Sequence, residues 1–400
     1  MYKVVTLGLG YIGLPTSVLI ASNGIDVYGV DINKNILNSI KKGQAHIAEP
    51  NLNSKLKEVV KNESFKVGLN PIQGNVYLIV VPTPFKKDHT PDISYIEAAT
   101  LEIIPLLKDD DLFIIESTSP VGTTERIRDL IYSKRPELNN KINIAYCPER
   151  VLPGNIMYEL IHNDRVIGGI NDESSERAAH FYSTFVLGKL NTTNSRTAEM
   201  CKLTENSSRD VQIAFANELS IICDKAGIDV RELIKLANLH PRVDILNPGC
   251  GVGGHCIAVD PYFITSKFPL ESKLISTGRE INNYKALWCV EKIINTQKEF
   301  ETNKKLTPSI ALLGLTFKPN IDDLRESPAL FIAKKIKSKI KNKNLFFVEP
   351  NIEVEKELEI TDLKTAIQVS DIVVILVAHK EFIDIDLSNK IVIDFCGARQ

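Results

Sequence analysis

The sequence predicts an α/β protein in which a helical central domain joins two α/β domains. Short apolar strands alternate with helical stretches near both ends of the chain, a pattern typical of parallel sheets covered by helices. Between them, residues 195–226 contain neither proline nor glycine and repeat apolar side chains at helical spacing, which predicts one long spine helix. A length of 400 residues also favours more than one domain. We expect the domains to span residues 1–192, 193–300 and 301–400.

The N-terminal domain begins with a glycine-rich turn between a strand and a helix. Lys3–Leu7 predicts a buried strand, and a helix is expected from about Ile12 to Ser22. A second strand, Asp26–Val30, ends in Asp31. The turn itself reads Gly8-Leu9-Gly10-Tyr11-Ile12-Gly13, which fits the pattern GxGxxG. This order of strand, glycine turn, helix, strand and acid predicts a dinucleotide site, whereas a GxGxxG run alone is weak evidence.

The residues of this turn have separate expected roles. Gly8 makes the tight turn, Gly10 admits a pyrophosphate, and Gly13 lets the helix pack on the strand. The helix N-terminus faces the phosphates. Asp31 is placed to accept hydrogen bonds from ribose hydroxyls, which favours NAD over NADP. The expected cofactor-binding residues here are Gly8, Gly10, Tyr11, Ile12, Gly13 and Asp31.

Two further strands end in small polar loops. The continuous apolar runs Tyr77–Val81 and Leu112–Glu116 predict parallel-sheet strands. Ligands of open α/β sheets bind outside the carboxyl ends of such strands, so Thr83 and Thr118 in the loops are candidate cofactor contacts. Simple capping of the loops is an equally good explanation of these threonines.

Charged residues follow the next strand and lie along the long helix. The strand Ile144–Tyr146 leads into Cys147-Pro148-Glu149-Arg150. On the helix, Lys202, Asn206 and Arg209 are spaced so that they share one face. Taken alone, such a stripe is more typical of a solvated surface. A long helix between domains also commonly provides a subunit interface.

The most informative segment of the chain is a glycine-rich turn that leads into Cys256. It reads Gly249-Cys250-Gly251-Val252-Gly253-Gly254-His255-Cys256, and Asp260 follows four residues later. A helix starting near His255 would place Cys256 at its positive end, where the pKa of a thiol falls. Asp260 would then lie on the same face as Cys256. The alternative is an inert core cysteine, which is the commoner case for a single thiol.

A second α/β domain follows a charged stretch. A helix is expected over Lys273–Lys298, and the charged residues Glu299–Lys305 form a candidate linker. After the first strand of this domain, Lys318 and Arg325 could reach phosphates or sugar oxygens, with ordinary surface cations as the alternative. The expected elements are strands Ser309–Leu313, Leu345–Val348, Ile372–Val377 and Ile391–Asp394, and helices Pro328–Lys339 and Asp362–Gln368.

Composition narrows the range of functions. The formal net charge of −2 argues against a nucleic-acid surface. Seven cysteines, an odd number without a CxxC pair, disfavour a disulfide framework and favour a reducing cytoplasm. The uncharged run Val4–Ala21 is interrupted by three glycines and a proline, so a membrane span is not expected. The seven histidines are scattered, and no metal site is expected.

Taken together, these motifs resemble the UDP-glucose/GDP-mannose dehydrogenase family over nearly the whole chain. The matching segments occur in order: GLGYIG with Asp31, VPTP, STSPVGTT, CPERVLPG, the Lys202–Asn206 helix, GVGGHCIAVDP and GLTFKPNIDDLRESP. The resemblance implies two Rossmann-like domains joined by a helical domain with a spine helix. It also implies a cytoplasmic, NAD-dependent enzyme that oxidises C6 of a nucleotide sugar to a carboxylate with two NAD⁺.

Within this family, the segments CPERVLPG and His240-Pro241-Arg242-Val243 are most similar to enzymes that act on UDP-N-acetyl-D-mannosamine. UDP-N-acetylglucosamine and UDP-glucose are the alternative substrates. Cys250 departs from the family pattern, because proline or another small residue is expected there. The resemblance further implies a homodimer or a dimer of dimers that makes precursors of surface polysaccharides or glycans.

The chemistry explains why such an enzyme needs a nucleophile. Loss of one hydride from the alcohol gives an aldehyde, which offers no second hydride until a nucleophile adds to it. By resemblance, Cys256 forms a thiohemiacetal and then a thioester, which water hydrolyses. Lys202 acts as general acid/base, and Asn206 holds the same oxygen through a bound water or directly. Either Asp260 or Glu149 activates the water.

The resemblance also assigns binding residues. His240 and Arg242 are expected to reach the substrate of the neighbouring subunit, where the guanidinium suits a developing carboxylate. Arg325 is an expected cofactor contact. The expected substrate-binding residues are Arg150, Val151, Lys202, Asn206, Arg209, His240, Arg242, Gly253 and Lys318. A two-electron hydroxyacid dehydrogenase or a non-catalytic nucleotide-binding protein would not need Cys256, so both alternatives fit less well.

Overall fold

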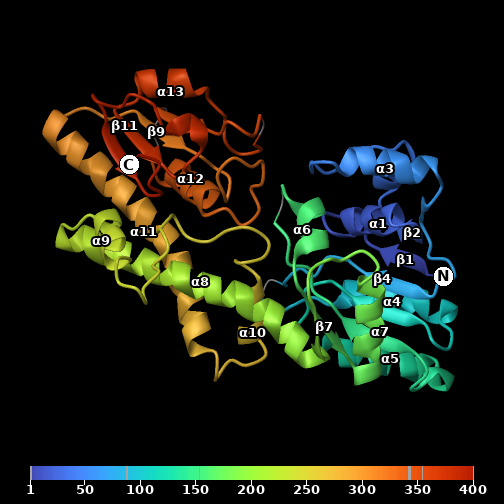
Figure 1. Cartoon of the computed structure of the whole chain (residues 1–400). Coiled ribbons are helices and arrows are strands. Elements are labelled where there is room, and N and C mark those ends of the chain that lie inside the picture. The colour runs from blue at the N-terminus through green and yellow to red at the C-terminus, as the bar shows by residue number, and fades with distance from the viewer. Residues whose placement is uncertain (1, 87–88, 153, 341–343, 354, 400) are drawn as a thin grey trace. The chain divides into compact units, whose positions relative to one another are not determined.

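The structure is a computed structural model that describes residues 2–86, 89–152, 154–340, 344–353 and 355–399 (Figure 1). The chain divides into two compact units. One contains Met1–Thr204 with Tyr262–Lys267, and the other contains Glu205–Pro261 with Phe268–Gln400. Each unit is built around one sheet of mainly parallel strands.

The first unit holds an eight-stranded sheet in the order β3-β2-β1-β4-β5-β6-β7-β8. Its first six strands are parallel neighbours, whereas β7 is antiparallel to β6 and β8 is parallel to β7. The strands are β1 (Lys3–Leu7), β2 (Asp26–Val30), β3 (Phe65–Gly68), β4 (Val76–Ile79), β5 (Leu112–Ile115), β6 (Asn143–Tyr146), β7 (Arg165–Gly169) and β8 (Leu190–Asn194).

Helices cover both faces of this sheet, because successive side chains of its strands point to opposite sides. Val4 and Leu78 enter one apolar cluster, whereas Val5 and Tyr77 enter the other. The helices of this unit are α1 (Gly13–Ser22), α2 (Lys34–Lys41), α3 (Leu52–Lys61), α4 (Ser94–Ile103), α5 (Thr123–Lys134), α6 (Ile156–His162), α7 (Asp172–Tyr182) and α10 (Asp260–Thr265), with 3₁₀ turns at Ile104–Leu106 and Pro136–Leu138. The first two residues of α10, Asp260 and Pro261, belong to the second unit.

The second unit holds a four-stranded parallel sheet in the order β10-β9-β11-β12. Its strands also divide their side chains between two clusters, with Leu312 in one and Leu313 in the other. The strands are β9 (Ile310–Leu313), β10 (Leu345–Val348), β11 (Ile372–Ile375) and β12 (Ile391–Asp394), and the helices are α8 (Ser195–Ala226), α9 (Val230–Ala237), α11 (Lys273–Lys304), α12 (Pro328–Lys339) and α13 (Leu363–Val369), with a 3₁₀ turn at Lys380–Phe382.

The long helix α8 has the bounds that the sequence predicts, and its first residues belong to the first unit. By contrast, the expected linker Glu299–Lys305 is wrong for most of its length, because α11 continues to Lys304. Glu and Lys are good helix formers, and Gln297 donates to Glu301 one turn away at 2.9 Å. High charge density therefore marks an exposed helix end here.

Helix α12 begins where proline and serine place it. Ser327 is the N-cap, and its hydroxyl accepts from the Leu330 N–H at 3.2 Å. Pro328 occupies the first turn, where its missing N–H costs nothing. The expected bounds of this helix, like those of β1, β2, β10 and β12, match the structure.

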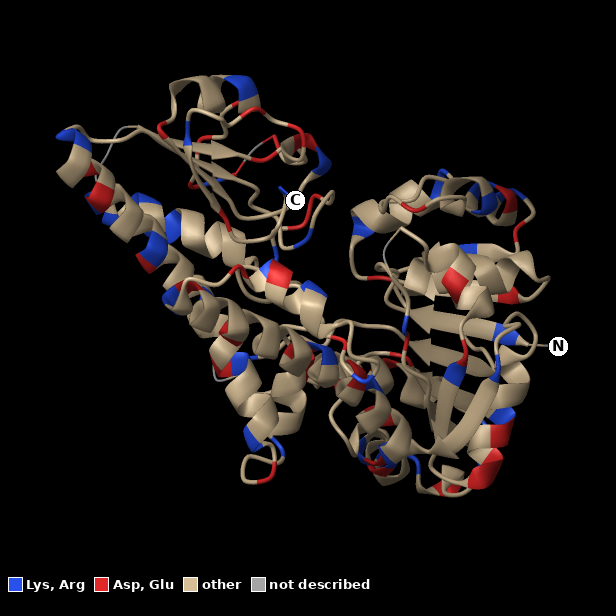
Figure 2. Cartoon of the chain, turned by 60° about the vertical axis from the view of Figure 1, so that its left-hand side comes forward, with Lys and Arg blue, Asp and Glu red and all other residues tan. Residues whose placement is uncertain are grey.

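The charged residues of both units are of mixed sign. Figure 2 shows acidic and basic residues interspersed along the helices of both units. In the part of the chain that the structure describes, no helix combines the length and apolar character needed to cross a bilayer.

Candidate active site

The glycine turn after β1 has the geometry of a dinucleotide turn. Gly8 has φ of +93°, and a Cβ there would lie 2.4 Å from the carbonyl oxygen of Val80. A Cβ on Gly13 would lie 1.9 Å from the Gly8 carbonyl oxygen, so helix α1 can start against the strand only with glycine. A Cβ on Gly10 would meet no protein atom within 4 Å. Gly10 therefore faces open space, as a position that admits a pyrophosphate requires.

Asp31 follows β2 and supports the glycine turn. Its Oδ2 accepts from the Leu9 N–H at 3.0 Å, and its Oδ1 accepts from the Asn33 N–H at 2.8 Å. The half-buried carboxylate keeps lone pairs for a ribose, because each oxygen can accept more than one hydrogen bond. Tyr11 is exposed, whereas Ile12 is half-buried immediately before α1. These positions fit the cofactor site that the sequence predicts, with the N-terminal end of α1 beside the open position of Gly10.

The loops after β4 and β5 place Thr83 and Thr118 at the same edge of the sheet, because parallel strands end together. Both threonines are half-buried. The two loops are tied by Ser117, whose hydroxyl donates to the Val81 carbonyl at 2.7 Å. Sequence reasoning did not single out this serine. Its hydrogen bond holds the two threonine-bearing loops together.

The charged exit of β6 lies against a buried network. Glu149 is half-buried, and its Oε2 accepts from the Arg165 guanidinium at 3.0 Å. Arg165 also lies 4.8 Å from the centre of the Tyr182 ring, and the Tyr182 hydroxyl donates to Glu116 at 2.6 Å. Burial raises the pKa of Glu116 to about 7, against the opposing effect of Arg165. Arg150 and Val151 follow Glu149 and are half-buried.

Sequence reasoning missed Arg165, Tyr182 and Glu116. They come from separate segments without a shared motif, and only the alignment of β5, β6 and β7 and the packing of α7 on these strands bring them together. The one sign of this network in the sequence is Glu116, an acid at the end of the otherwise apolar run Leu112–Glu116.

Helix α8 carries three of the predicted residues in different environments. Lys202 and Asn206 are half-buried, whereas Arg209 is exposed. The Asn206 side chain donates to Asp260 Oδ2 at 2.5 Å. Earlier on the helix, the buried Glu199 carboxylate accepts from the N–H groups of Gly122 and Thr124 at 2.5 and 2.8 Å. The start of α8 is thus fixed to the N-terminal end of α5.

The turn around Cys256 differs in one respect from the expectation. The expected helix start near His255 is wrong, because α10 begins at Asp260. The Cys256 carbonyl accepts from the N–H groups of Val259 and Asp260 at 2.9 and 2.8 Å, so the intervening residues form a turn. Cys256 is half-buried and Asp260 is buried, with its carboxylate held by Asn206. The spacing does bring Asp260 one turn from Cys256.

A buried chain of hydrogen bonds anchors the start of this turn to α8 and α11. The Gly249 N–H donates to Asn217 Oδ1 at 2.9 Å, and Asn217 donates to Asn282 at 2.8 Å. Asn282 in turn donates to the Asp210 carboxylate at 2.8 Å. The Arg279 guanidinium forms an ion pair with the same carboxylate at 2.6 Å. The turn is therefore positioned by the two longest helices of the chain.

Cys250 has a structural environment. It is buried in the apolar cluster of the second unit, and its Sγ donates to the Leu376 carbonyl at 3.3 Å. Hydrogen bonding with Cys289 and burial raise the pKa of Cys250 well above its usual value. A thiol that stays protonated is a poor nucleophile. This second thiol is thus separated in role from Cys256 by its surroundings.

The glycines before Cys256 pack on the loop that follows β9. A Cβ on Gly253 would lie 2.5 Å from the Glu326 carbonyl oxygen, and a Cβ on Gly254 would lie 2.8 Å from the Phe317 ring. The Gly254 N–H donates to the Arg325 carbonyl at 3.0 Å. The Arg325 side chain pairs with Asp323 at 2.6 Å. Close packing explains why this segment needs glycine.

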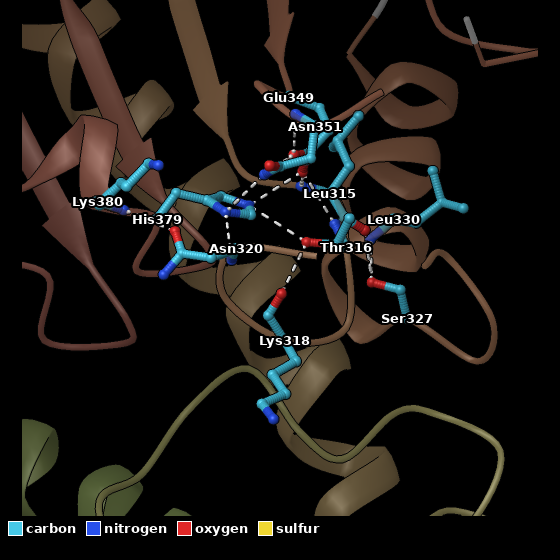
Figure 3. A network of polar contacts seen from close by, with 10 residues as sticks. All are labelled: Leu315, Thr316, Lys318, Asn320, Ser327, Leu330, Glu349, Asn351, His379 and Lys380. Carbon is cyan, nitrogen blue, oxygen red and sulfur yellow. Dashed lines mark hydrogen bonds and ion pairs between the residues drawn. The ribbon is translucent and has the colours of Figure 1, made fainter. Parts of the chain in front are cut away.

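The loop after β9 resembles the glycine turn after β1, because it also begins with a glycine of positive φ and is held by a carboxylate. Gly314 has φ of +89°, and a Cβ there would lie 2.6 Å from the Val377 side chain. Glu349, at the end of β10, accepts from the N–H groups of Leu315 and Thr316 at 2.7 and 3.1 Å (Figure 3). Lys318 is exposed in this loop and points away from the hydrogen-bonded residues in Figure 3.

His240 and Arg242 lie in a turn after α9, and both are exposed. The Arg242 N–H donates to His240 Nδ1 at 3.4 Å, so the two residues share one short turn. Their exposure leaves both side chains accessible to another molecule.

Comparison with known proteins decides the family. Models of the UDP-glucose/GDP-mannose dehydrogenase family match the chain in three segments: the NAD binding domain over residues 2–186, the central domain over 196–284 and the UDP binding domain over 311–399. The chain belongs to the UDP-glucose/GDP-mannose dehydrogenase family. The fold class, the NAD cofactor and the oxidoreductase class predicted from the sequence are thereby confirmed.

Members of the UDP-glucose/GDP-mannose dehydrogenase family resemble the chain over almost its full length. It is 50% identical over 410 residues to a UDP-N-acetyl-D-mannosamine dehydrogenase of Campylobacter jejuni, covering 98% of this chain and 99% of that protein. A protein of the same name from Escherichia coli K12 is 50% identical over 392 residues, covering 94% and 93%. A solved UDP-D-ManNAc dehydrogenase of Pyrococcus horikoshii is 37% identical, with a TM-score of 0.89 and coverage of 100% and 96%.

Proposed function

We propose that the chain oxidises C6 of UDP-N-acetyl-D-mannosamine to give UDP-N-acetyl-D-mannosaminuronate. The observation that carries this substrate is the 50% identity, over nearly the whole of both chains, to the dehydrogenase of Campylobacter jejuni that bears its name. The NAD-binding and UDP-binding segments supply the means to bind oxidant and substrate. A role in making precursors of surface polysaccharides, in the cytoplasm, agrees with this product.

The reaction needs two hydride transfers and one hydrolysis. The C6 alcohol loses a hydride to NAD⁺ and a proton to Lys202, which leaves an aldehyde. The Cys256 thiolate adds to the aldehyde carbon and the oxygen takes up a proton, which gives a thiohemiacetal. Loss of its proton and of a second hydride, to a second NAD⁺, gives a thioester on Cys256. Water then releases the carboxylate and regenerates the thiol.

Neighbouring side chains support these steps. Asn206 holds the reacting oxygen, and a contact of this kind contributes about 3 kcal/mol to the stability of the transition state. Its partner Asp260 is one candidate to orient the hydrolytic water, because its carboxylate is buried one turn from Cys256. Glu149 is the other candidate, and Arg165 holds its carboxylate in place.

The proposed substrate contacts are Arg150, Val151, Lys202, Asn206, Arg209, Gly253 and Lys318. Cofactor contacts are Thr83, Thr118 and Arg325 besides the glycine turn and Asp31. The three-domain division at residues 1–192, 193–300 and 301–400 follows the same assignment, with the central domain carrying Cys256.

The functional assembly is proposed to be a homodimer or a dimer of dimers. Large apolar side chains are exposed along α8 and α11, among them Phe215, Ile222, Tyr284 and Leu287, each at least 45% exposed. Exposed apolar side chains on adjoining helices are typical of subunit interfaces. His240 and Arg242 would then reach the substrate of the neighbouring subunit from their exposed turn.

A coupled assay tests the proposal. Purified protein is incubated with NAD⁺ and, separately, UDP-N-acetylmannosamine, UDP-N-acetylglucosamine or UDP-glucose. We expect turnover with the first sugar and two NADH for each sugar consumed. Turnover only with another sugar would reject the substrate, and one NADH per sugar would reject the thioester route.

A further inference from the structure

One buried histidine outside the predicted site holds both ends of the loop that carries Lys318. His379 follows β11 and is fully buried, as is its partner Glu349. No motif in the sequence singles out either residue. Their side chains meet beside the loop Thr316–Asn320, and Figure 3 shows the histidine ring close to Glu349, Thr316 and Asn320.

Hydrogen bonds fix the tautomer of the His379 ring. The Asn320 N–H lies 2.9 Å from Nδ1, and the Asn351 side-chain amide lies 3.1 Å from the same nitrogen. Two N–H donors require Nδ1 to be an acceptor, so the hydrogen of the neutral ring lies on Nε2. Nε2 lies 3.2 Å from Glu349 Oε2 and 3.2 Å from Thr316 Oγ1, and its N–H faces these two acceptors.

The same contacts connect the ring to Lys318. The Thr316 hydroxyl accepts from His379 and donates to the Lys318 carbonyl at 3.0 Å. On the other side, the Asn320 N–H donates to Nδ1. His379 therefore holds the loop two residues before and two residues after Lys318. The loop has little freedom to move while these hydrogen bonds are intact.

Glu349 completes this hydrogen-bond network. Burial alone would raise the pKa of this carboxyl group, but hydrogen bonds from His379 and from the N–H groups of Leu315 and Asn351 outweigh burial and hold the pKa of Glu349 at about 2. The carboxylate thus stays charged and anchors both the ring and the first residues of the loop. Unlike Asp31, it is fully buried and cannot reach a ribose.

The loop also supports the turn that leads to Cys256. The Phe317 ring lies against Gly254, and the Phe317 N–H donates to the Asp323 carbonyl at 3.1 Å. A shift of the loop would therefore move the packing surface of the cysteine turn as well as Lys318.

We propose that His379 is a positioning residue that, with Glu349, holds the loop Thr316–Asn320 so that Lys318 meets the UDP part of the substrate. The inference rests on the proposed function for the contact between Lys318 and the nucleotide. It does not depend on which sugar is oxidised, because the loop lies within the UDP binding domain.

The test uses UDP affinity, measured by calorimetry on the full chain without turnover. His379→Ala is expected to weaken UDP binding by about tenfold or more, because the loop loses both anchors. NAD⁺ affinity is expected to stay unchanged. Lys380→Ala is the matched control, since its side chain is 76% exposed and its N–H still donates to Asn320. Unchanged UDP affinity in a folded His379→Ala protein would overturn the proposal.

Two conservative variants separate positioning from core filling. Asn at 379 keeps an acceptor near Nδ1 for the Asn320 N–H, whereas Gln keeps a donor near Nε2 and fills more of the volume. Each variant keeps one of the two anchors, so positioning predicts that both bind UDP more tightly than His379→Leu, which fills the volume but can neither accept nor donate a hydrogen bond. Equal UDP affinity in folded His379→Leu, His379→Asn and His379→Gln would show that the ring only fills the core, and it would overturn the proposal. Both variants also serve if His379→Ala does not fold.

A double-mutant cycle tests the route through Lys318. If His379 acts by placing Lys318, the losses of UDP affinity in His379→Ala and Lys318→Ala will not add in the double variant. Fully additive losses would contradict this route. An unchanged UDP affinity in Lys318→Ala would instead reject the proposed substrate contact of Lys318, while absence of NADH formation with normal UDP binding would reject only the proposed reaction.

Discussion

Two thiols six residues apart have different chemistry because their surroundings differ. Cys256 is half-buried after a glycine turn, one turn before the buried carboxylate of Asp260. Cys250 lies in an apolar cluster and donates its hydrogen to the Leu376 carbonyl. Sequence spacing alone could not separate them, because both lie in the same glycine-rich segment. The separation depends on packing against β11, which lies more than a hundred residues away in the chain.

The first prediction concerns these thiols. Cys256→Ser is expected to lower kcat by about 10⁴-fold or more, because serine is a far weaker nucleophile at neutral pH. Cys250→Ser is the matched control and is expected to keep kcat within about threefold, since a hydroxyl can also donate to the Leu376 carbonyl. Steady-state NADH formation with both purified variants checks this. Full activity of Cys256→Ser with loss in Cys250→Ser would reassign the nucleophile.

At the scale of elements, the ends of three neighbouring strands enclose a buried charged network. Glu116 follows β5, Glu149 follows β6, and Arg165 begins β7. One guanidinium faces two carboxyl groups, and burial keeps Glu116 protonated over much of the acidic range. Arg165 then pairs with Glu149 at 3.0 Å and fixes the position of this side chain.

The second prediction follows from the raised pKa of Glu116. A carboxyl group whose pKa rises from 4.5 to about 7 on folding favours the folded state below pH 4.5, and this contribution is lost as pH rises through 7. Glu116→Gln cannot ionise, so its stability is expected to fall less between pH 5 and 8, by on the order of 1–3 kcal/mol. Urea unfolding across this range measures the difference. Parallel curves for both proteins would contradict the prediction.

Elements were predictable where their signals are local. Helix α12 has serine and proline at its start, and α8 has a long run without proline or glycine, so both match their expected bounds. The continuation of α11 was missed because a dense run of charges resembles a linker. Strands β7 and β8 were not predicted, and β7 pairs antiparallel to β6 at the end of an otherwise Rossmann-like order.

The site was predictable where residues follow one another in motifs. The glycine turn with Asp31 and the segment Gly253–Asp260 could be located from spacing alone. Glu199, Arg165 and His379 could not, because each acts on a segment that is distant in sequence. Residues that bind a ligand tend to lie in recognisable loops, whereas residues that hold those loops depend on the tertiary fold.

On the scale of the whole molecule, the two units share one arrangement of a glycine turn and a carboxylate. In each unit a glycine with positive φ, Gly8 or Gly314, follows the first strand. A carboxylate after the next strand, Asp31 or Glu349, accepts a hydrogen bond from a backbone N–H of that glycine turn. In the first unit Asp31 stays half-buried and Gly10 faces open space. In the second, Thr316 occupies the place of that glycine and Glu349 is enclosed by His379. The second turn is therefore unsuited to a dinucleotide held in the manner of the first.

The last prediction is that NAD⁺ and UDP protect different parts of the chain. At about one hundred times its Kd, each ligand stabilises the region it binds by about 2.7 kcal/mol. We expect NAD⁺ to slow amide hydrogen exchange in the turn Gly8–Gly13 and UDP to slow exchange in the loop Thr316–Asn320. Gly10→Ala should fold normally, because its Cβ meets no protein atom, yet lose the NAD⁺ effect by blocking the pyrophosphate. The same variant should keep the full UDP effect, so loss of both, or protection of the glycine turn by UDP, would show that the two turns do not serve separate ligands.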